Sequence, residues 1–177
     1  MSWVSTRDTS DVRPFGAAVL AGAASRGGLY VPVQIPQHSD IDALLPLPFA
    51  ERAARLLAPW VGDVDDLPAL CADAFDFPIP LVRLSEHRAV LELFHGPTLA
   101  FKDFGARFLA RILAQVRSER RITVLTATSG DTGAAVAHAF HQVPGIDVHV
   151  LYPEGRISPL QERLFCGLGG NVQTWAV

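Results

Sequence analysis

The chain has 177 residues, of which 49% are hydrophobic and 19% are charged, and its formal net charge is −3. This length accommodates about one domain with a substantial core, and the composition excludes long disordered segments. The sequence has no basic run of the kind that binds nucleic acid. Its first residues do not resemble a signal peptide, and no apolar run approaches the ~18 residues that span a bilayer. We therefore expect a cytoplasmic protein with no nucleic-acid or membrane partner.

The cysteines and histidines show no pattern typical of a disulfide framework or a metal site. Cys71 and Cys166 are far apart and form no CxxC motif, so we expect two free, buried thiols in a reducing compartment. His138 and His141 are three residues apart in a predicted helix, a spacing that metals can use, but no third ligand accompanies them. We expect no bound metal.

Residues 1–90 are rich in proline, which predicts short helices and extended segments. Small apolar residues over 12–24 predict a packed helix. Residues 29–32 form an expected extended segment. Apolar residues at helical spacing over 49–57 predict a further helix, which Pro59 is expected to close.

From about residue 89 onward, predicted strands and helices alternate. In chain order we expect a strand over 89–94, a helix over 102–116, a strand over 122–127, a helix over 134–140 and a strand over 147–152. Ser158, Pro159 and Gln161 predict a capped helix start, and a last strand is expected over 172–177. This alternation indicates an α/β domain with a parallel sheet. Because the last strand ends uncovered at the final residue, we expect a truncated chain.

Lys102 is a candidate nucleophile at the start of the helix predicted over 102–116, between Phe101 and Asp103. A partly desolvated lysine has more of its amine in the neutral form that attacks an aldehyde. A lysine whose stem lies on apolar surface while its ammonium stays in water is the commoner case. The local sequence alone favours the second interpretation.

Residues 126–133, Thr-Ala-Thr-Ser-Gly-Asp-Thr-Gly, form a second candidate element between a predicted strand and a predicted helix. Its two glycines allow the backbone to approach a ligand closely. Free N–H groups at a helix N-terminus, together with the hydroxyls of Thr128, Ser129 and Thr132, suit a carboxylate or a phosphate. The segment matches neither a Walker A loop nor the GxGxxG fingerprint, and an ordinary capped turn remains an open alternative.

A lysine that opens one helix, followed one β-α unit later by a hydroxyl-rich glycine turn, resembles the serine/threonine dehydratase superfamily of pyridoxal phosphate (PLP) enzymes. The chain is more similar to the threonine synthase family. That resemblance extends over five blocks in register, at residues 27–32, 91–105, 125–140, 152–162 and 168–172.

The resemblance implies the fold and the site. It implies a fold type II enzyme, with 1–90 as a threonine synthase N-terminal domain and 91–177 as the first part of a three-layer αβα domain with a parallel sheet. It implies PLP held by Lys102 as a Schiff base, with Phe101 and Asp131 as further cofactor-binding residues. The residues implied to bind the substrate are Thr128, Ser129, Gly130, Thr132 and Gly133.

The resemblance also implies the reaction, in which O-phospho-L-homoserine and water give L-threonine and phosphate. The superfamily often has Asn, facing the cofactor's 3-oxygen, where this chain has Asp131. The family's phosphate-binding loop lies later in its chain and has no counterpart here, so we expect this chain alone to bind free PLP weakly. Two alternatives stay open: another PLP-dependent elimination enzyme such as a dehydratase, and a non-catalytic truncated chain that acts as a binding or assembly module.

Overall fold

The computed structural model describes residues 1–62 and 64–177. The chain opens with a small antiparallel sheet in which β1 (Ser2–Ser5) lies between β2 (Val12–Pro14) and β3 (Tyr30–Pro32). Helix α1 (Phe15–Ala21) follows β2 directly. The expectation of a helix from residue 12 is therefore wrong at its start, because Val12 pairs with Val4 of β1. The extended segment expected over 29–32 is confirmed as β3.

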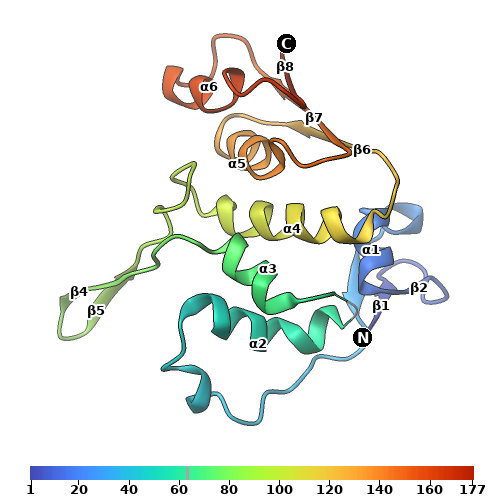
Figure 1. Cartoon of the computed structure of the whole chain (residues 1–177), viewed down its shortest axis with the longest axis vertical. Helices are drawn as coiled ribbons and strands as arrows, with labels where there is room; N and C mark the ends of the chain where they lie inside the picture. Colours follow the sequence, from blue (N-terminus) through green and yellow to red (C-terminus); the bar gives the residue numbers. More distant parts are fainter. Residues whose placement is uncertain (63) are drawn as a thin grey trace.

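Two helices form the lower layer of the molecule in the view of Figure 1. Helix α2 (Phe49–Val61) continues through Pro59 and ends at Gly62, which has φ +59°. The prediction that Pro59 closes this helix is wrong, because the proline falls in the last turn, where Gly62 N still donates to Ala58 O. Helix α3 (Leu67–Ala74) was not predicted. Short 3-10 turns precede these helices at Ser25–Gly27 and Asp42–Leu44.

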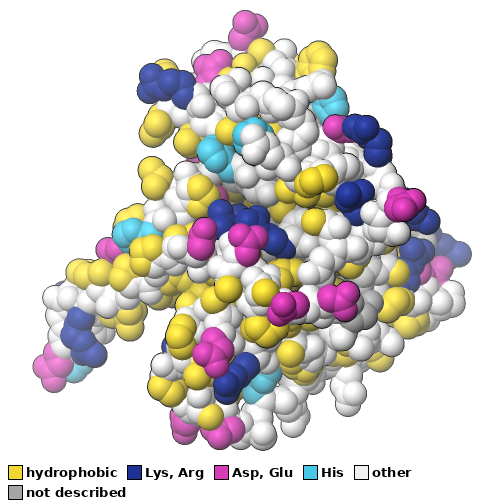
Figure 2. All heavy atoms as spheres, viewed as in Figure 1, with side chains coloured by type: hydrophobic (Ala, Val, Ile, Leu, Met, Phe, Trp, Pro, Cys, Tyr) yellow, Lys and Arg dark blue, Asp and Glu magenta, His cyan; other side chains and the backbone are white. Residues whose placement is uncertain are grey.

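Strands β4 (Leu81–Ser85) and β5 (Arg88–Leu91) form a hairpin that projects from the body of the molecule (Figure 1). The strand expected over 89–94 is therefore shorter, and it pairs antiparallel with its neighbour in sequence instead of joining the parallel sheet. A two-residue connection makes that local pairing possible. Hydrophobic side chains remain exposed along both strands, as Figure 2 shows. They are Leu81, Val82, Leu84, Val90 and Leu91.

The C-terminal part has the predicted α/β architecture. Strands β6 (Ile122–Ala127), β7 (Ile146–Tyr152) and β8 (Val172–Ala176) form a parallel sheet in the order β6-β7-β8. The connecting helices are α5 (Asp131–Phe140) and α6 (Pro159–Cys166), and α4 (Lys102–Val116) packs on α5. The α/β class, the parallel sheet and the bounds of α4 are confirmed. Among the described residues, no helix is both long and apolar enough to cross a membrane.

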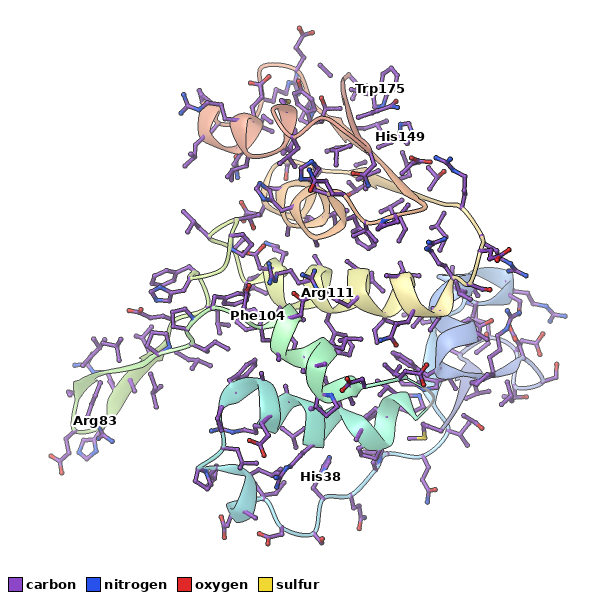
Figure 3. The ribbon with its side chains drawn as sticks, in the orientation of Figure 1. His38, Arg83, Phe104, Arg111, His149 and Trp175 are labelled. Carbon is purple, nitrogen blue, oxygen red and sulfur yellow. The ribbon has the colours of Figure 1, made fainter. Side chains whose placement is uncertain are left out.

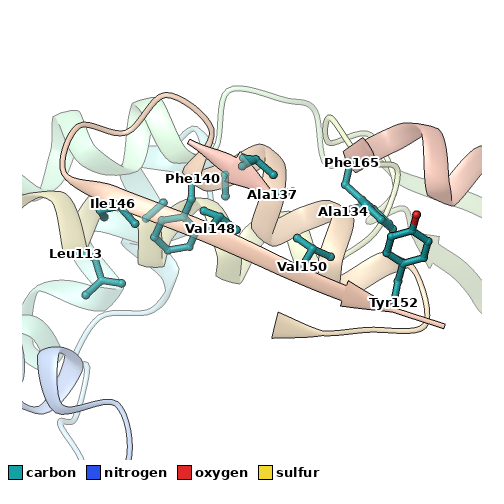
Figure 4. Packing of buried hydrophobic residues seen from close by; sticks show 12 residues of the cluster. Leu113, Ala134, Ala137, Phe140, Ile146, Val148, Val150, Tyr152 and Phe165 are labelled. Atoms are coloured by element: carbon teal, nitrogen blue, oxygen red, sulfur yellow. The ribbon is translucent and has the colours of Figure 1, made fainter. Parts of the chain in front are cut away.

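The main core lies between the sheet and helices α4, α5 and α6 (Figure 4). Alternate residues of β7 point into it, and Val148 and Val150 are fully buried against Phe140 and Phe165. This alternation is what a strand with one covered face requires. The opposite face of the sheet presents Trp175, which is 50% exposed and donates through Nε1 to His149 Nδ1 at 3.1 Å (Figure 3).

The two cysteines have different environments, so the expectation of two buried thiols is correct for only one. Cys71 in α3 is fully buried, and burial raises the pKa of its thiol to about 11. Cys166 at the end of α6 is exposed, and its thiol donates to Tyr152 OH at 3.5 Å.

We predict that a thiol reagent distinguishes the two cysteines in the native protein. At pH 8 only about one Cys71 thiol in a thousand is ionised, because the thiolate is the reactive form and its population falls tenfold per pH unit below the pKa. Ellman's reagent should therefore titrate one thiol quickly, and the second only after denaturation. Equal rates for both thiols in native protein, or loss of the fast phase in Cys71→Ser instead of Cys166→Ser, contradict this prediction.

Candidate active site

The loop that leads into α4 fixes the position of Lys102. Asp103, in the first turn of α4, is fully buried and accepts hydrogen bonds from Thr98 N at 2.9 Å and from Thr98 Oγ1 at 2.7 Å. Gly96 lies directly against this carboxyl group, so a Cβ atom there would approach Asp103 Oδ2 within 2.4 Å. These contacts hold Gly96 and Thr98 of the loop against the first turn of α4, next to Lys102.

Lys102 is the first residue of α4, and its amine is accessible but not free in solution. Its side chain is 34% exposed, and Nζ lies 3.5 Å from Asp131 Oδ2 at the start of α5. The same Nζ lies 4.5 Å from the centroid of the Phe101 ring, which is itself exposed. The structure therefore brings together the three residues expected to hold PLP.

The turn over 128–133 is organised by the hydroxyl of Thr128. Thr128 Oγ1 accepts hydrogen bonds from Gly130 N and Gly133 N, both at 3.0 Å. Gly130 has φ +145°, a backbone conformation that favours glycine. Two of the N–H groups expected to hold a ligand are thus bonded within the turn itself.

Other N–H groups of the same turn remain available. In the part of the chain that the structure describes, no acceptor is found for the backbone N–H groups of Ser129, Asp131 and Thr132. These groups lie at the N-terminus of α5, where the helix dipole also favours an anion. Gly130 and Gly133 shape the turn, and Ser129 and Thr132 present free donors.

Asp131 joins α5 to two other elements. Its Oδ1 accepts a hydrogen bond from Gln161 Nε2 of α6 at 2.8 Å, while Oδ2 faces Lys102 of α4. The Gln161 hydrogen bond, followed by the positive charge of Lys102, holds the pKa of the Asp131 carboxyl below its usual range. The capping box at Ser158 and Gln161 is confirmed, but its sequence signal gave no indication of this second contact.

No metal centre is found among the described residues, because no three of their His, Cys, Asp or Glu side chains gather around one point. His138 contacts the backbone instead: its Nε2 lies 2.7 Å from the carbonyl oxygen of Leu164.

Comparison with known proteins gives this geometry its context. Residues 2–75 match the family described as "Threonine synthase N terminus", and residues 75–173 match the family described as "Pyridoxal-phosphate dependent enzyme". The second match covers more than half of the chain. The chain belongs to the pyridoxal-phosphate dependent enzyme family. Within this family Lys102, Asp131 and the 128–133 turn all fall inside the matched region.

The similarity to threonine synthases extends across the chain. It is 54% identical to the threonine synthase of Haemophilus influenzae over 92% of its own length and 39% of that relative. The structure superposes on threonine synthase from Escherichia coli with a TM-score of 0.93 at 46% identity, covering all of this chain and 42% of that one. For PLP-bound threonine synthase from Brucella melitensis the TM-score is 0.92 at 39% identity, covering 99% of this chain and 41% of that one. The chain thus spans about two fifths of the length of these relatives.

Proposed function

We propose that this chain carries the lysine and carboxylate-binding side of a threonine synthase active site, which converts O-phospho-L-homoserine and water into L-threonine and phosphate. The observation that carries the proposal is the approach of Lys102 Nζ to within 3.5 Å of Asp131, beside a turn with unpaired N–H donors. A nucleophilic amine and an anion-binding turn are the two elements that an amino-acid substrate of a PLP enzyme requires.

The residues present fit attachment of PLP. Lys102 offers a partly exposed amine, Phe101 lies beside it, and Asp131 presents a carboxylate oxygen toward the same point. When bound, PLP supplies an electron sink for reactions at the substrate's α and β carbons. The chain's own contribution is to bind, orient and move protons, and the proposed role of the Lys102 amine is to exchange protons at those two carbons.

The turn after β6 is proposed to hold the substrate carboxylate. The free N–H groups of Ser129, Asp131 and Thr132 point to an anion at the start of α5, and the Thr132 hydroxyl is exposed beside them. Thr128 acts indirectly, because its hydroxyl oxygen already accepts from Gly130 and Gly133 and so keeps the turn closed.

Three wider expectations belong to the same proposal. We keep the prediction that residues 1–90 form an N-terminal domain and that residues 91–177 form the first part of a PLP-binding domain. A cytoplasmic location and a small-molecule substrate are consistent with an amino-acid biosynthetic reaction.

The sequence allows a specific labelling test, because Lys102 is the only lysine among its 177 residues. The other fourteen members of its Lys and Arg total are arginines. Arginine cannot replace lysine in a Schiff base. Protein mixed with PLP should absorb near the edge of the visible range, and borohydride should then fix one label at Lys102. The matched control is Lys102→Arg, which keeps the charge beside Asp131 and should reduce the label to background.

Two results would overturn the proposal: a label found solely on the α-amino group of Met1, or equal labelling of Lys102→Arg. The products made from O-phospho-L-homoserine identify the reaction. Threonine and phosphate in equal amounts indicate a synthase, whereas phosphate released with a 2-oxo acid and ammonia indicates an elimination enzyme of the dehydratase type.

A further inference from the structure

Gln161 connects helix α6 to the lysine site through Asp131. Its Nε2 donates to Asp131 Oδ1 at 2.8 Å, and the other oxygen of the same carboxylate lies 3.5 Å from Lys102 Nζ. The two carboxylate oxygens therefore have different partners, a neutral donor on one side and a cation on the other. Rotation of the Asp131 side chain would break both contacts at once.

The orientation of the Gln161 amide is set by the cap of α6. Its Oε1 accepts from Ser158 N at 3.3 Å and from Ser158 Oγ at 3.2 Å, while Gln161 N donates to Ser158 Oγ at 3.2 Å. These contacts use the acceptor end of the amide. The donor end is left to face the carboxylate, and a flipped amide would present oxygen to oxygen.

The turn before α5 leaves room for this contact. A Cβ atom at Gly130 would lie 2.3 Å from Gln161 Nε2 and 2.5 Å from Gln161 Cδ. Gly130 is buried beneath the glutamine side chain, so any larger residue there would push the amide away from Asp131.

We infer that Gln161 is a positioning residue of the active site, which holds the Asp131 carboxylate in place beside Lys102. This inference rests on the proposed function, because the carboxylate matters only if Lys102 receives a ligand. An ionised carboxylate can accept a hydrogen bond from a group bound there, whereas a protonated one competes as a donor. Gln161 is also the leading cause of the lowered pKa of Asp131, and Lys102 is the charged group that faces it from α4.

The decisive variant is Gln161→Glu. Glutamate at this position accepts the same capping hydrogen bonds, and an acidic residue in the first turn suits the helix dipole, so α6 should stay folded. It would, however, place a second carboxylate against Asp131. We expect the thermal midpoint to change little, the Asp131 carboxyl to titrate at higher pH, and the rate of borohydride-trapped PLP labelling at Lys102 to fall about tenfold.

The matched control is Ser158→Ala, which removes the hydroxyl of the cap but keeps the Ser158 N–H that donates to Gln161 Oε1 and so still orients the amide. It should lower the thermal midpoint and leave both the Asp131 titration and the labelling rate near those of the original chain. The Asp131 signal is followed by carbon-13 NMR and assigned by its loss in Asp131→Asn. If the glutamine serves only the cap, Gln161→Glu should leave the Asp131 titration and the labelling rate unchanged, and Ser158→Ala should lower the labelling rate. That result would overturn the inference.

Failure of the proposed function has a different signature. If the original chain takes up no label at Lys102, the proposed function fails. The Asp131 titration still decides whether Gln161 controls that carboxylate, because it needs no PLP.

Discussion

Asp103→Asn is expected to lower the free energy of unfolding by about 3 kcal/mol, because it leaves a buried donor without its charged acceptor. Asp103 is fully buried, and its two oxygens accept from the backbone N–H and the hydroxyl of Thr98. Asparagine offers one acceptor oxygen and turns an NH2 group toward the other donor. The change also weakens the side-chain hydrogen bonds that hold the loop before Lys102, so trapping of PLP at Lys102 should fall with it. Urea unfolding followed by fluorescence measures the first effect.

Asp76→Asn is the matched control for this prediction. Asp76 pairs with Arg107 at 2.7 Å, but its side chain is 59% exposed. An ion pair whose carboxylate is exposed to water contributes about 1 kcal/mol or less, so the same chemical change should cost far less there. If the two variants lose equal stability, burial of the Thr98 donors is not what makes Asp103 important.

The elements that sequence predicted well are those whose signals are local. The apolar spacing of 102–116 predicted α4 to the residue, and the Ser158, Pro159 and Gln161 pattern predicted the cap of α6. In both segments the helix period or the capping chemistry is contained within a few neighbouring residues. No distant part of the chain has to be known to interpret them.

Two of the errors occurred where pairing partners decide the structure. Val12 and Arg13 have side chains that a helix would accept, but they form β2 because β1 lies beside them. The strand near residue 90 has the apolar composition of many strands, and nothing in its own residues indicates a hairpin partner instead of the parallel sheet. Strand pairing depends on the whole fold, and single-sequence patterns do not contain it.

In the candidate site, too, local features could be predicted from the sequence and long-range contacts could not. Lys102 and the 128–133 turn were found because their residue types and order carry chemistry along the chain. The contact of Gln161 with Asp131 joins residues 30 positions apart, so it emerges only when α5 and α6 pack together. The choice of which N–H groups stay free also depends on one rotamer, that of Thr128, which sequence does not specify.

Gly133→Ala is expected to lower the free energy of unfolding by about 2 kcal/mol, although alanine is the better helix former by about 1 kcal/mol. Gly133 lies in α5, and a Cβ atom there would be 2.2 Å from Thr128 Cγ2 and 3.1 Å from Val150 Cγ1. Val150 is fully buried in the core and cannot yield easily. Thr128 cannot rotate away without losing the hydrogen bonds that its hydroxyl accepts from Gly130 and Gly133.

Gly105→Ala provides a control with the opposite sign. Gly105 lies in the interior of α4 and is exposed, and in the described part of the chain no atom beyond its own helix backbone and chain neighbours lies within 4 Å of an added Cβ. Only the helix preference of alanine remains there, so this variant should gain about 0.5–1 kcal/mol. Chemical denaturation of both variants tests the pair, and a loss of stability at both positions would show that glycine is needed for something other than close packing.

Thr128→Ser tests the cause of the Gly133→Ala effect directly. Serine keeps the hydroxyl that closes the turn and removes the Cγ2 methyl that the new Cβ would strike. In the Gly133→Ala background this second change should restore most of the lost stability, while alone it should cost less than about 1 kcal/mol. If the two changes are instead additive, the clash with Thr128 does not explain the glycine, and contact with Val150 becomes the cause to examine.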